Sequence, residues 1–557
     1  MRQILSIVLF FLVTSGFSQI PQKYFIAFTD KNNNPYSIGD PGAFLTQRAI
    51  NRRIAQGISI TEEDLPVTPS YVDAVTTTGV QVFTRCKWYN GVTVRVADTN
   101  VLASIRALPF VQSVTRVSSY DFKKSAISDR KFMLESEFGN GTENHHPESN
   151  GSAASYNYGP SYNQIHLLNG DLLHDMDYRG QGKVIAVLDA GFLDADNNPV
   201  FDSLRTNNQI LGTRDLVNPG GNVYAEHYHG AAVLSTMGGN TPGELIGTAP
   251  KANYWLIRTE DAETENIVEE YNWVVGAEMA DSVGADVINS SLGYTVFDNG
   301  WMDHTCADMN GYTNPSSRGA NIAANKGMAL SISAGNEGGS FWTCVSSPSD
   351  ALNALSIAAV DESGNYASFS STGIINGTYV KPNIASQGQN CYVGYPGGSF
   401  GYGNGTSYAS PINAGMVACL WQAIPAVDQS QLRTAIQESA NQYTNPDKYL
   451  GYGIPDYNKA MLLLHVSRPG ESSIMAYPNP FTDDFAISFD TNMTGKMELS
   501  LVSVTGVLVM KKEIYRTAGS GKTYDIKDVA NLAPGMYILK ISSGTTSENI
   551  RLVKTGK

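Results

Sequence analysis

The 557-residue sequence contains no CxxC pair and no run of about 18 consecutive apolar residues. The first absence argues against zinc knuckles and dithiol redox motifs, and the second argues against a transmembrane segment in the mature chain. Basic residues are also scarce, since 38 Lys and Arg stand against 52 Asp and Glu and give a formal net charge of -14. A nucleic-acid partner is therefore not expected, because such proteins present a basic face to phosphates.

Apolar residues make up 42% and charged residues 16% of the sequence, a composition typical of globular proteins. The length is too great for one core and predicts about three to four domains. The 53 glycines and 24 prolines favour many strands joined by tight loops over helical bundles.

The first residues are typical of an export signal. Arg2 gives a positive start, the run from Ile4 to Val13 is apolar except for Ser6, and small residues precede Gln19. We interpret residues 1–18 as a signal peptide, with a buried N-terminal strand as the alternative. The mature protein is then expected to be secreted or to lie at the cell surface.

Changes in composition and periodicity divide the rest of the chain. A small α+β unit is expected over residues 19–118, with a basic helix over 44–56 and a hairpin turn at Asn90-Gly91. Residues 119–158 are rich in polar residues and predict an exposed linker open to proteolytic cleavage. A second polar linker, residues 467–473, precedes a module of short alternating strands over 474–557, predicted to be a small β-sandwich.

Residues 159–466 alternate between apolar strands and helical patterns. The expected strands share the continuous apolar runs typical of strands buried on both faces: Val184 to Leu188, Tyr254 to Ile257, Asp286 to Asn289, Met328 to Ser333 and Leu355 to Val360. This pattern predicts an α/β domain with a doubly wound, mainly parallel sheet and helices on both faces. Ligands of such sheets bind at the carboxyl ends of the strands.

Four polar residues occur at predicted strand ends or helix starts of this domain. Asp189 ends the first strand, His229 opens an apolar helical run, Asn336 follows a strand, and Ser407 precedes Pro411 in a first helical turn. Acyl transfer by serine needs a nucleophile, a base, a carboxylate that orients the base, and donors for the oxyanion. The four residues together supply these groups.

Each of the four residues also has a structural interpretation. Asp189 alone fits a turn or cap aspartate, Ser407 a helix N-cap, and Asn336 a left-handed turn residue. His229 forms a His-x-His pair with His227, which would suit a metal, but no third ligand is evident. The ordered set as a whole favours the catalytic interpretation.

The segments VIAVLDAGF, HGAAV, AGNEG and GTSYASP resemble the signature blocks of the subtilisin-like serine proteases (subtilases), in the order and with the spacing of that family. The resemblance implies that Asp189 orients, His229 acts as general base and acid, and Ser407 is the nucleophile. It also implies an oxyanion hole formed by Asn336 and the Ser407 N–H. Three positions depart from the family pattern without removing a catalytic group: Ala190, Ala231 and Tyr408.

Two further blocks are similar to the family's substrate-binding strands, which pair with an extended peptide. They are Ser291, Leu292 and Gly293 in one block, and Ser333, Ala334 and Gly335 in the other. The resemblance implies that no cofactor is needed for the chemistry. Structural calcium is common in the family, but we assign no site, and we interpret the acidic stretch 194–198 as a turn.

The flanking modules also resemble parts of known precursors. By pattern and position, residues 19–118 are similar to a subtilase propeptide, which implies a folding chaperone and inhibitor that is cut off between Ser118 and Tyr158. The motifs YPNP, VTG and LAPGMY, with a basic tail, resemble the type IX secretion sorting domain of Bacteroidetes bacteria. This resemblance implies export through the periplasm and across the outer membrane by the type IX machinery. A carbohydrate- or protein-binding module is the alternative.

Of the five cysteines, Cys306 and Cys344 lie in polar, loop-like stretches and form the pair expected first. Cys419 lies in an apolar helical pattern and is expected to be a buried thiol, while the state of Cys391 stays open.

The sequence therefore predicts a secreted serine endopeptidase that hydrolyses proteins or peptides through an acyl-enzyme and is made as a self-inhibited precursor. One alternative is a catalytically silent surface adhesin on the same scaffold. The other is an esterase or lipase with the same triad, against which the missing GxSxG motif argues.

Overall fold

The computed structural model describes residues 22–118, 156–373, 379–466 and 474–555, apart from 490–493, 504–505, 518–522, 528 and 544–545. The expected signal peptide (1–18), nearly all of the expected linker 119–158 and the linker 467–473 lie outside the described residues. None of the helices in the described ranges combines the length and apolar character needed to cross a membrane.

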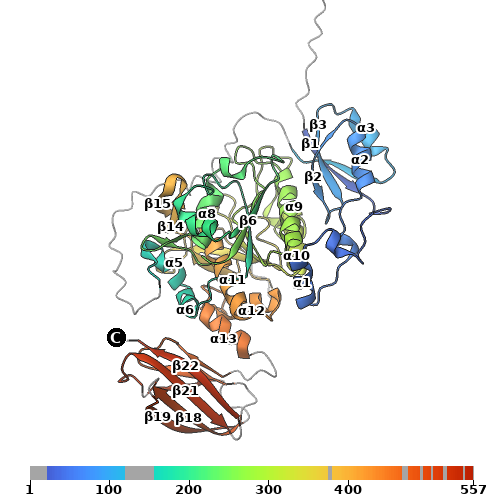
Figure 1. The fold of residues 1–557 in the computed structure, drawn as a ribbon. Helices are drawn as coiled ribbons and strands as arrows, with labels where there is room; N and C mark the ends of the chain where they lie inside the picture. Colours follow the sequence, from blue (N-terminus) through green and yellow to red (C-terminus); the bar gives the residue numbers. More distant parts are fainter. Residues whose placement is uncertain are drawn as a thin grey trace, which may run out of the picture.

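The N-terminal unit is a four-stranded antiparallel sheet in the order β2-β3-β1-β4, with α2 and α3 on one face (Figure 1). Its elements are β1 Gln22–Phe28, α2 Pro69–Thr77, β2 Gln81–Cys86, β3 Gly91–Val96, α3 Val101–Arg106 and β4 Val111–Arg116. The predicted hairpin is confirmed, since β2 pairs with β3 and Asn90 adopts a φ of 44° in the turn. Ile26, Val75, Val94 and Ile105 belong to a core of this unit alone.

The connection from β1 to α2 leaves this unit. It carries α1 Gln47–Ala55 and two short 3-10 helices, η1 Pro41–Ala43 and η2 Glu62–Asp64. The predicted basic helix is therefore present, but it lies beside the C-terminal end of α9 Val268–Val283 in the central domain (Figure 1).

The central domain is built on a parallel sheet whose described strands follow the order β13-β12-β11-β10-β5-β9-β6. They are β5 Val184–Asp189, β6 Ile210–Asp215, β9 Asn253–Arg258, β10 Val287–Ser290, β11 Ala329–Ser333, β12 Leu355–Val360 and β13 Ile384–Gln387. Their pairings are parallel, which confirms the predicted α/β fold. The sequence pattern did not indicate β6, because this edge strand is half-exposed and has no continuous apolar run.

Helices cover both faces of this sheet (Figure 1). Ile185 and Val187 of β5 pack with α8 His229–Gly238 and α11 Thr406–Ala423, whereas Ala186 and Leu188 pack with α9 and α10 Pro315–Asn325. This alternation explains the uninterrupted apolar run of β5. The remaining elements are η3 Gly159–Ser161, α5 Tyr162–His166, α6 Gly170–Asp175, η4 Pro199–Phe201, α7 Asp202–Thr206, η5 Val223–Ala225, β7 Asn240–Thr241, β8 Leu245–Ile246, η6 Cys306–Asp308, β14 Cys391–Tyr395, η7 Pro396–Gly398, β15 Ser399–Gly403, α12 Gln429–Ser439 and α13 Tyr457–Val466.

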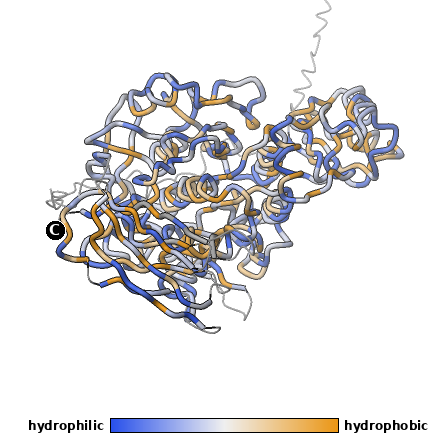
Figure 2. Tube along the Cα trace, turned by 60° about the horizontal axis from the view of Figure 1, so that its bottom comes forward, coloured by the Kyte–Doolittle hydropathy of each residue, from blue (hydrophilic) through white to orange (hydrophobic). Residues whose placement is uncertain are grey.

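The C-terminal region consists of two small antiparallel sheets around one apolar core, which confirms the predicted strand-rich module. One sheet has the order β16-β17-β20 and the other β19-β18-β21-β22. The strands are β16 Met475–Tyr477, β17 Phe485–Ser488, β18 Gly495–Ser503, β19 Leu508–Arg516, β20 Thr523–Ile526, β21 Gly535–Ser543 and β22 Thr546–Lys554. Figure 2 shows hydrophobic and hydrophilic residues alternating along these strands, as expected when one face is buried.

His174 of α6 is a fully buried imidazole in the central domain. Its Nδ1 lies 2.8 Å from the Tyr158 hydroxyl and its Nε2 lies 2.9 Å from the Thr248 carbonyl oxygen. Burial lowers the pKa of His174 to about 4. Between about pH 6.5 and 4 the unfolded histidine binds a proton that the folded one does not, so the free energy of unfolding falls as the pH falls.

We therefore expect His174→Gln to flatten the pH dependence of stability. The free energy that the wild type loses between about pH 7 and 4.5 should shrink by about 2 kcal/mol in the variant, measured by urea unfolding at both pH values. His166→Gln is the control, because the Asp171 side chain raises the pKa of His166, and its change has the opposite sign. Equal losses in the wild type and in His174→Gln would contradict the assignment.

Candidate active site

Asp189, the last residue of β5, and His229, the first residue of α8, form a buried pair. His229 Nδ1 lies 2.6 Å from Asp189 Oδ1, and both side chains are fully inaccessible to solvent. The Ala190 N–H also donates to Asp189 Oδ1, at 2.7 Å. A Cβ at Gly230 would collide with the Gly191 carbonyl, so glycine lets α8 begin this close to β5. A carboxylate on Nδ1 favours the tautomer in which Nε2 accepts a proton.

Ser407 lies in the first turn of α11 beside the segment that follows β10. Its Oγ donates to the Ser291 carbonyl at 3.4 Å, and Ser291 Oγ donates to the Ser407 carbonyl at 2.8 Å. The ring of the next residue, Tyr408, lies 6.5 Å from the His229 ring, measured between centroids. The N-termini of α8 and α11 therefore meet, and Ser407 N–H lies at the positive end of an 18-residue helix.

Buried polar side chains fix α11 on the sheet. Ser410 Oγ donates to Asn289 Oδ1 of β10 at 2.9 Å, and Ser331 Oγ of β11 donates to the Ser410 carbonyl at 2.8 Å. Asn413 Nδ2 donates to the same Ser331 hydroxyl at 3.0 Å. These satisfied groups hold the start of the helix in one position relative to the strand ends, because a shift would leave buried polar atoms unpaired.

Asn336 follows β11 and is oriented by the residue before Ser407. The Thr406 N–H and hydroxyl both donate to Asn336 Oδ1, at 2.9 Å and 3.0 Å. The Gly335 N–H in turn donates to the Thr406 hydroxyl at 3.2 Å. Because the amide oxygen accepts both bonds from Thr406, the Nδ2 amino group is the end turned away from it. This role of Thr406 was not predicted from the sequence.

The two predicted substrate-binding blocks lie at the ends of neighbouring strands. Residues 291–293 directly follow β10, and residues 333–335 end and follow β11. Within the second block, the Ala334 N–H donates to the Ile357 carbonyl and the Ala334 carbonyl accepts from the Ser346 N–H, each at 3.0 Å. A Cβ built on Gly293 would collide with the Ser346 hydroxyl oxygen, and a Cβ built on Gly335 would lie 3.3 Å from the same oxygen. Ser346 thus lies between the blocks, a position that sequence spacing alone could not reveal.

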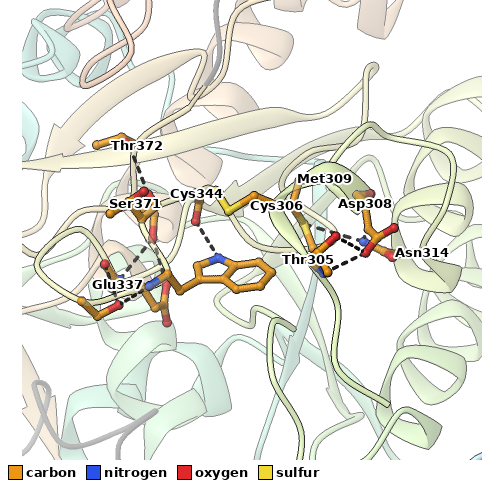
Figure 3. Close-up of a disulfide and its surroundings, with 12 residues drawn as sticks. Thr305, Cys306, Asp308, Met309, Asn314, Glu337, Cys344, Ser371 and Thr372 are labelled. Carbon is orange, nitrogen blue, oxygen red and sulfur yellow. Dashed lines mark hydrogen bonds between the residues drawn. A yellow bond between two sulfur atoms is a disulfide. The ribbon is translucent and has the colours of Figure 1, made fainter. Parts of the chain in front are cut away.

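A disulfide joins the loops that follow these two strands. Cys306, after β10, is bonded to Cys344, after β11, which confirms the pair expected from the sequence (Figure 3). The Trp342 Nε1–H donates to the Cys344 carbonyl at 3.0 Å. Cys419 is a buried free thiol in α11, also as predicted, and Cys391 is buried and free.

Removing the disulfide should lower stability. The bond closes a loop with a sequence separation of 38 residues, so Cys306→Ser combined with Cys344→Ser is expected to reduce the free energy of unfolding by about 2–4 kcal/mol. Urea unfolding measures the change, and Thr343→Ser, an exposed neighbour, is the control. A double variant as stable as the wild type would show that the two loops are held by other contacts.

Three buried glutamates form the group of described side chains whose ligand atoms could hold a metal ion. Glu260, Glu265 and Glu269 place one carboxylate oxygen each within 4.8 Å of one another. Oxygen ligands of this kind suit calcium or magnesium. His227 is not part of this group, and its Nδ1 accepts from the His229 N–H at 3.3 Å. The stretch 194–198 is a turn, as interpreted from the sequence.

Comparison with known proteins identifies three regions of the chain. Residues 180–453 match the subtilase family model, residues 23–131 match the peptidase S8 propeptide domain of Bacteroidota, and residues 475–555 match a secretion system C-terminal sorting domain. Subtilisin E from Bacillus subtilis (strain 168) is 28% identical over 294 residues, which are 52% of this chain and 68% of that protein. Thermitase from Thermoactinomyces vulgaris is 28% identical over 285 residues, which are 51% of this chain and 89% of that protein.

Among solved structures, the prenylagaramide maturation protease PagA aligns with a TM-score of 0.42 and 21% identity, over 52% of this chain and 96% of that chain. The parallel sheet, the ordered motifs and the family matches define a serine endopeptidase. Residues 180–453 are a subtilase domain, and the chain is a secreted precursor with an N-terminal propeptide and a C-terminal type IX sorting domain.

Proposed function

We propose that this precursor matures to an enzyme that hydrolyses peptide bonds through an acyl-enzyme on Ser407, with His229 as base and Asp189 as the orienting carboxylate. The observation that carries the proposal is the 2.6 Å contact between Asp189 and His229 at the point where the helix starts of α8 and α11 meet. In this structure Ser407 Oγ donates to the Ser291 carbonyl. This bond does not argue against the role of Ser407, because the catalytic bond from a serine to its base is often long or poorly aligned until substrate binds.

The proposed reaction uses each group in turn. Ser407 Oγ attacks the scissile carbonyl carbon while His229 Nε2 takes the hydroxyl proton. The negative charge that develops on the carbonyl oxygen is proposed to be stabilised by hydrogen bonds from Asn336 Nδ2 and the Ser407 N–H. His229 then gives its proton to the leaving amine, and a water molecule, deprotonated by the same imidazole, hydrolyses the acyl-enzyme.

Ser291–Gly293 and Ser333–Gly335 are proposed to hold the substrate as an extended strand beside Ser407. The contacts between Ser291 and Ser407 support this, because they place the first block directly at the nucleophile. Ser346, between the two blocks, is the proposed floor for the side chain before the scissile bond. The substrates are proteins or peptides, as in the family, and the chemistry is proposed to need no cofactor.

The propeptide is proposed to inhibit the enzyme and to be removed by cleavage between Ser118 and Tyr158. Its last described residues run along the central domain, where the Val117 carbonyl accepts from the Val268 N–H at 2.8 Å. Arg116 lies over the Trp301 ring at 5.0 Å. The sorting domain is proposed to direct the precursor through the periplasm to the type IX machinery and across the outer membrane, so that the mature enzyme is secreted or lies at the cell surface.

A fluorophosphonate probe tests the catalytic proposal. The matured protein should be labelled on Ser407, as located by peptide mass, whereas Ser407→Ala should stay unlabelled and Asn336→Ala should react more slowly. Ser399→Ala, an exposed serine of β15, is the control. Failure of a correctly processed wild type to react would favour the silent adhesin alternative.

A further inference from the structure

The segment 41–64, here called the arm, contacts the central domain at the edge opposite the candidate active site. The Thr46 N–H donates to the Ser282 carbonyl at 2.9 Å, and Gln56 Nε2 donates to the Gly327 carbonyl at 2.8 Å. Ser282 and Gly327 precede β10 and β11, so they lie at the amino ends of these strands, whereas Ser291 and Asn336 lie beyond the carboxyl ends. The arm and the candidate active site are therefore separated by the length of a strand, at about 3.3 Å per residue.

A buried carboxylate of α9 is the centre of this contact. Asp281 Oδ1 lies 2.5 Å from Arg52 and 2.9 Å from Arg53, and all three side chains are at most 4% exposed. Lys87 of the N-terminal unit adds a third cation, with its Nζ 3.4 Å from Asp281 Oδ2. Arg53 also reaches Asp64 at 3.0 Å, a residue of the arm itself.

Backbone carbonyls also accept hydrogen bonds from the arginines of α1. Together with Asp281 they form a site that we call the arginine receptor. Arg48 Nε donates to the Gly284 carbonyl at 2.8 Å, and Arg48 also pairs with Asp286. Arg52 donates to the Ala285 carbonyl. The carbonyls at the end of a helix carry partial negative charge, and α9 ends at Val283. Arg48, Arg52 and Arg53 of α1 therefore face a surface of opposite charge. Arg48 and Arg52 lie one helical turn apart, and Arg53 is the next residue.

The surface also fits the arm closely. A Cβ at Gly284 would stand 2.8 Å from the Ala49 backbone nitrogen and 2.7 Å from Arg48 Cγ. A Cβ at Gly327 would stand 2.8 Å from Gln56 Nε2 and from Ile58 Cδ1. Both glycines have a positive φ, of 82° and 91°. A side chain at Gly284 would collide with the backbone of α1 and push the arm away, whereas at Gly327 the tips of Gln56 and Ile58 would have to move.

The arm is a separate attachment of the propeptide. None of the residues of α1 belongs to the core between the four-stranded sheet and its helices, among the residues described. The sheet has its own contact with the middle of α9, where the Lys87 and Trp88 N–H groups donate to the Glu278 carboxylate at 2.9 Å each. The propeptide thus contacts α9 at more than one place along the helix.

We propose that the arm is a retention clamp: the arginine receptor around Asp281 keeps the cleaved propeptide bound, and release from it sets the delay between cleavage and activity. The inference rests on the proposed function, because it presupposes a propeptide that inhibits after it has been cut. Two linked contacts bind far more tightly than either alone, since the second forms within the complex. Losing the clamp should therefore speed release without changing the mature enzyme, which no longer carries the arm.

The experiment follows maturation of the full-length precursor in the wild type and in Arg52→Met combined with Arg53→Met. Mass spectrometry times cleavage in the linker, gel filtration times propeptide release, and a chromogenic peptide times activity. We expect equal cleavage rates, release at least about tenfold faster in the variant, and an unchanged final kcat/KM. Arg106→Met, an exposed arginine of α3, is the control and should behave as the wild type.

A second variant guards against misfolding of the first. Arg52→Lys combined with Arg53→Lys keeps both charges but loses the planar, forked contacts, so it should fold and show intermediate acceleration. Release at the wild-type rate in a folded variant of either kind overturns the retention clamp. Failure of the proposed function looks different: the wild type itself would then show cleavage without delayed activity, or no activity at all.

Discussion

Ser407→Ala is expected to lower kcat about 10⁶-fold, the order of loss that follows removal of the nucleophile from a Ser-His-Asp triad. The residual rate would come from binding and from the oxyanion donors, which the substitution leaves in place. Alanine loses the bond from Ser407 Oγ to the Ser291 carbonyl. It keeps the shorter bond from Ser291 Oγ to the carbonyl of residue 407 and the bond from the Thr406 N–H to Asn336, so the fold should be preserved.

The measurement needs protein that is cut in the linker, because Ser407→Ala should also accumulate as an uncut precursor if maturation is autocatalytic. Limited cleavage by an unrelated protease, followed by its removal, supplies matched samples of variant and wild type. Turnover of a peptide amide is then compared with that of Ser399→Ala. A residual rate within about 10²-fold of the wild type would exclude Ser407 as the nucleophile, because the oxyanion hole alone cannot supply that rate.

Asp189→Asn is expected to lower kcat about 10⁴-fold while changing KM little. The amide can donate to His229 Nδ1 where the carboxylate accepts, and it would stabilise the tautomer whose Nε2 already carries a proton. In the proposed mechanism, the buried carboxylate also stabilises the imidazolium that forms when Ser407 loses its proton, and the neutral amide cannot.

The control for this variant is Asp194→Asn, on the loop that follows β5. Asp194 Oδ2 accepts from the Gly397 N–H at 2.7 Å, a bond that the asparagine oxygen can keep. It should retain wild-type kcat. If Asp189→Asn kept more than about a tenth of the wild-type kcat, another group would have to orient His229.

The active-site candidates were accessible from the sequence because each lies in a short local motif. VIAVLD is a buried strand that ends in a carboxylate, and HGAAV and GTSYASP each place their reactive residue at a helix start. Disulfide pairing was also predictable, since Cys306 and Cys344 lie in polar loops. The two edge strands of the parallel sheet, β6 and β13, were not predicted, because β6 has exposed residues and β13 has only four residues, two of them polar.

The sequence by itself determined the alternation of strands and helices, the resemblance to a family, and the residue types of the candidate active site, because these depend on neighbours within one turn or one strand. Only the tertiary structure decided that Thr406 orients Asn336, that Ser346 lies between Gly293 and Gly335, and that Arg52 meets Asp281. These contacts join residues far apart in the chain. Their geometry depends on how the sheet and helices pack, and local sequence patterns carry no record of that packing.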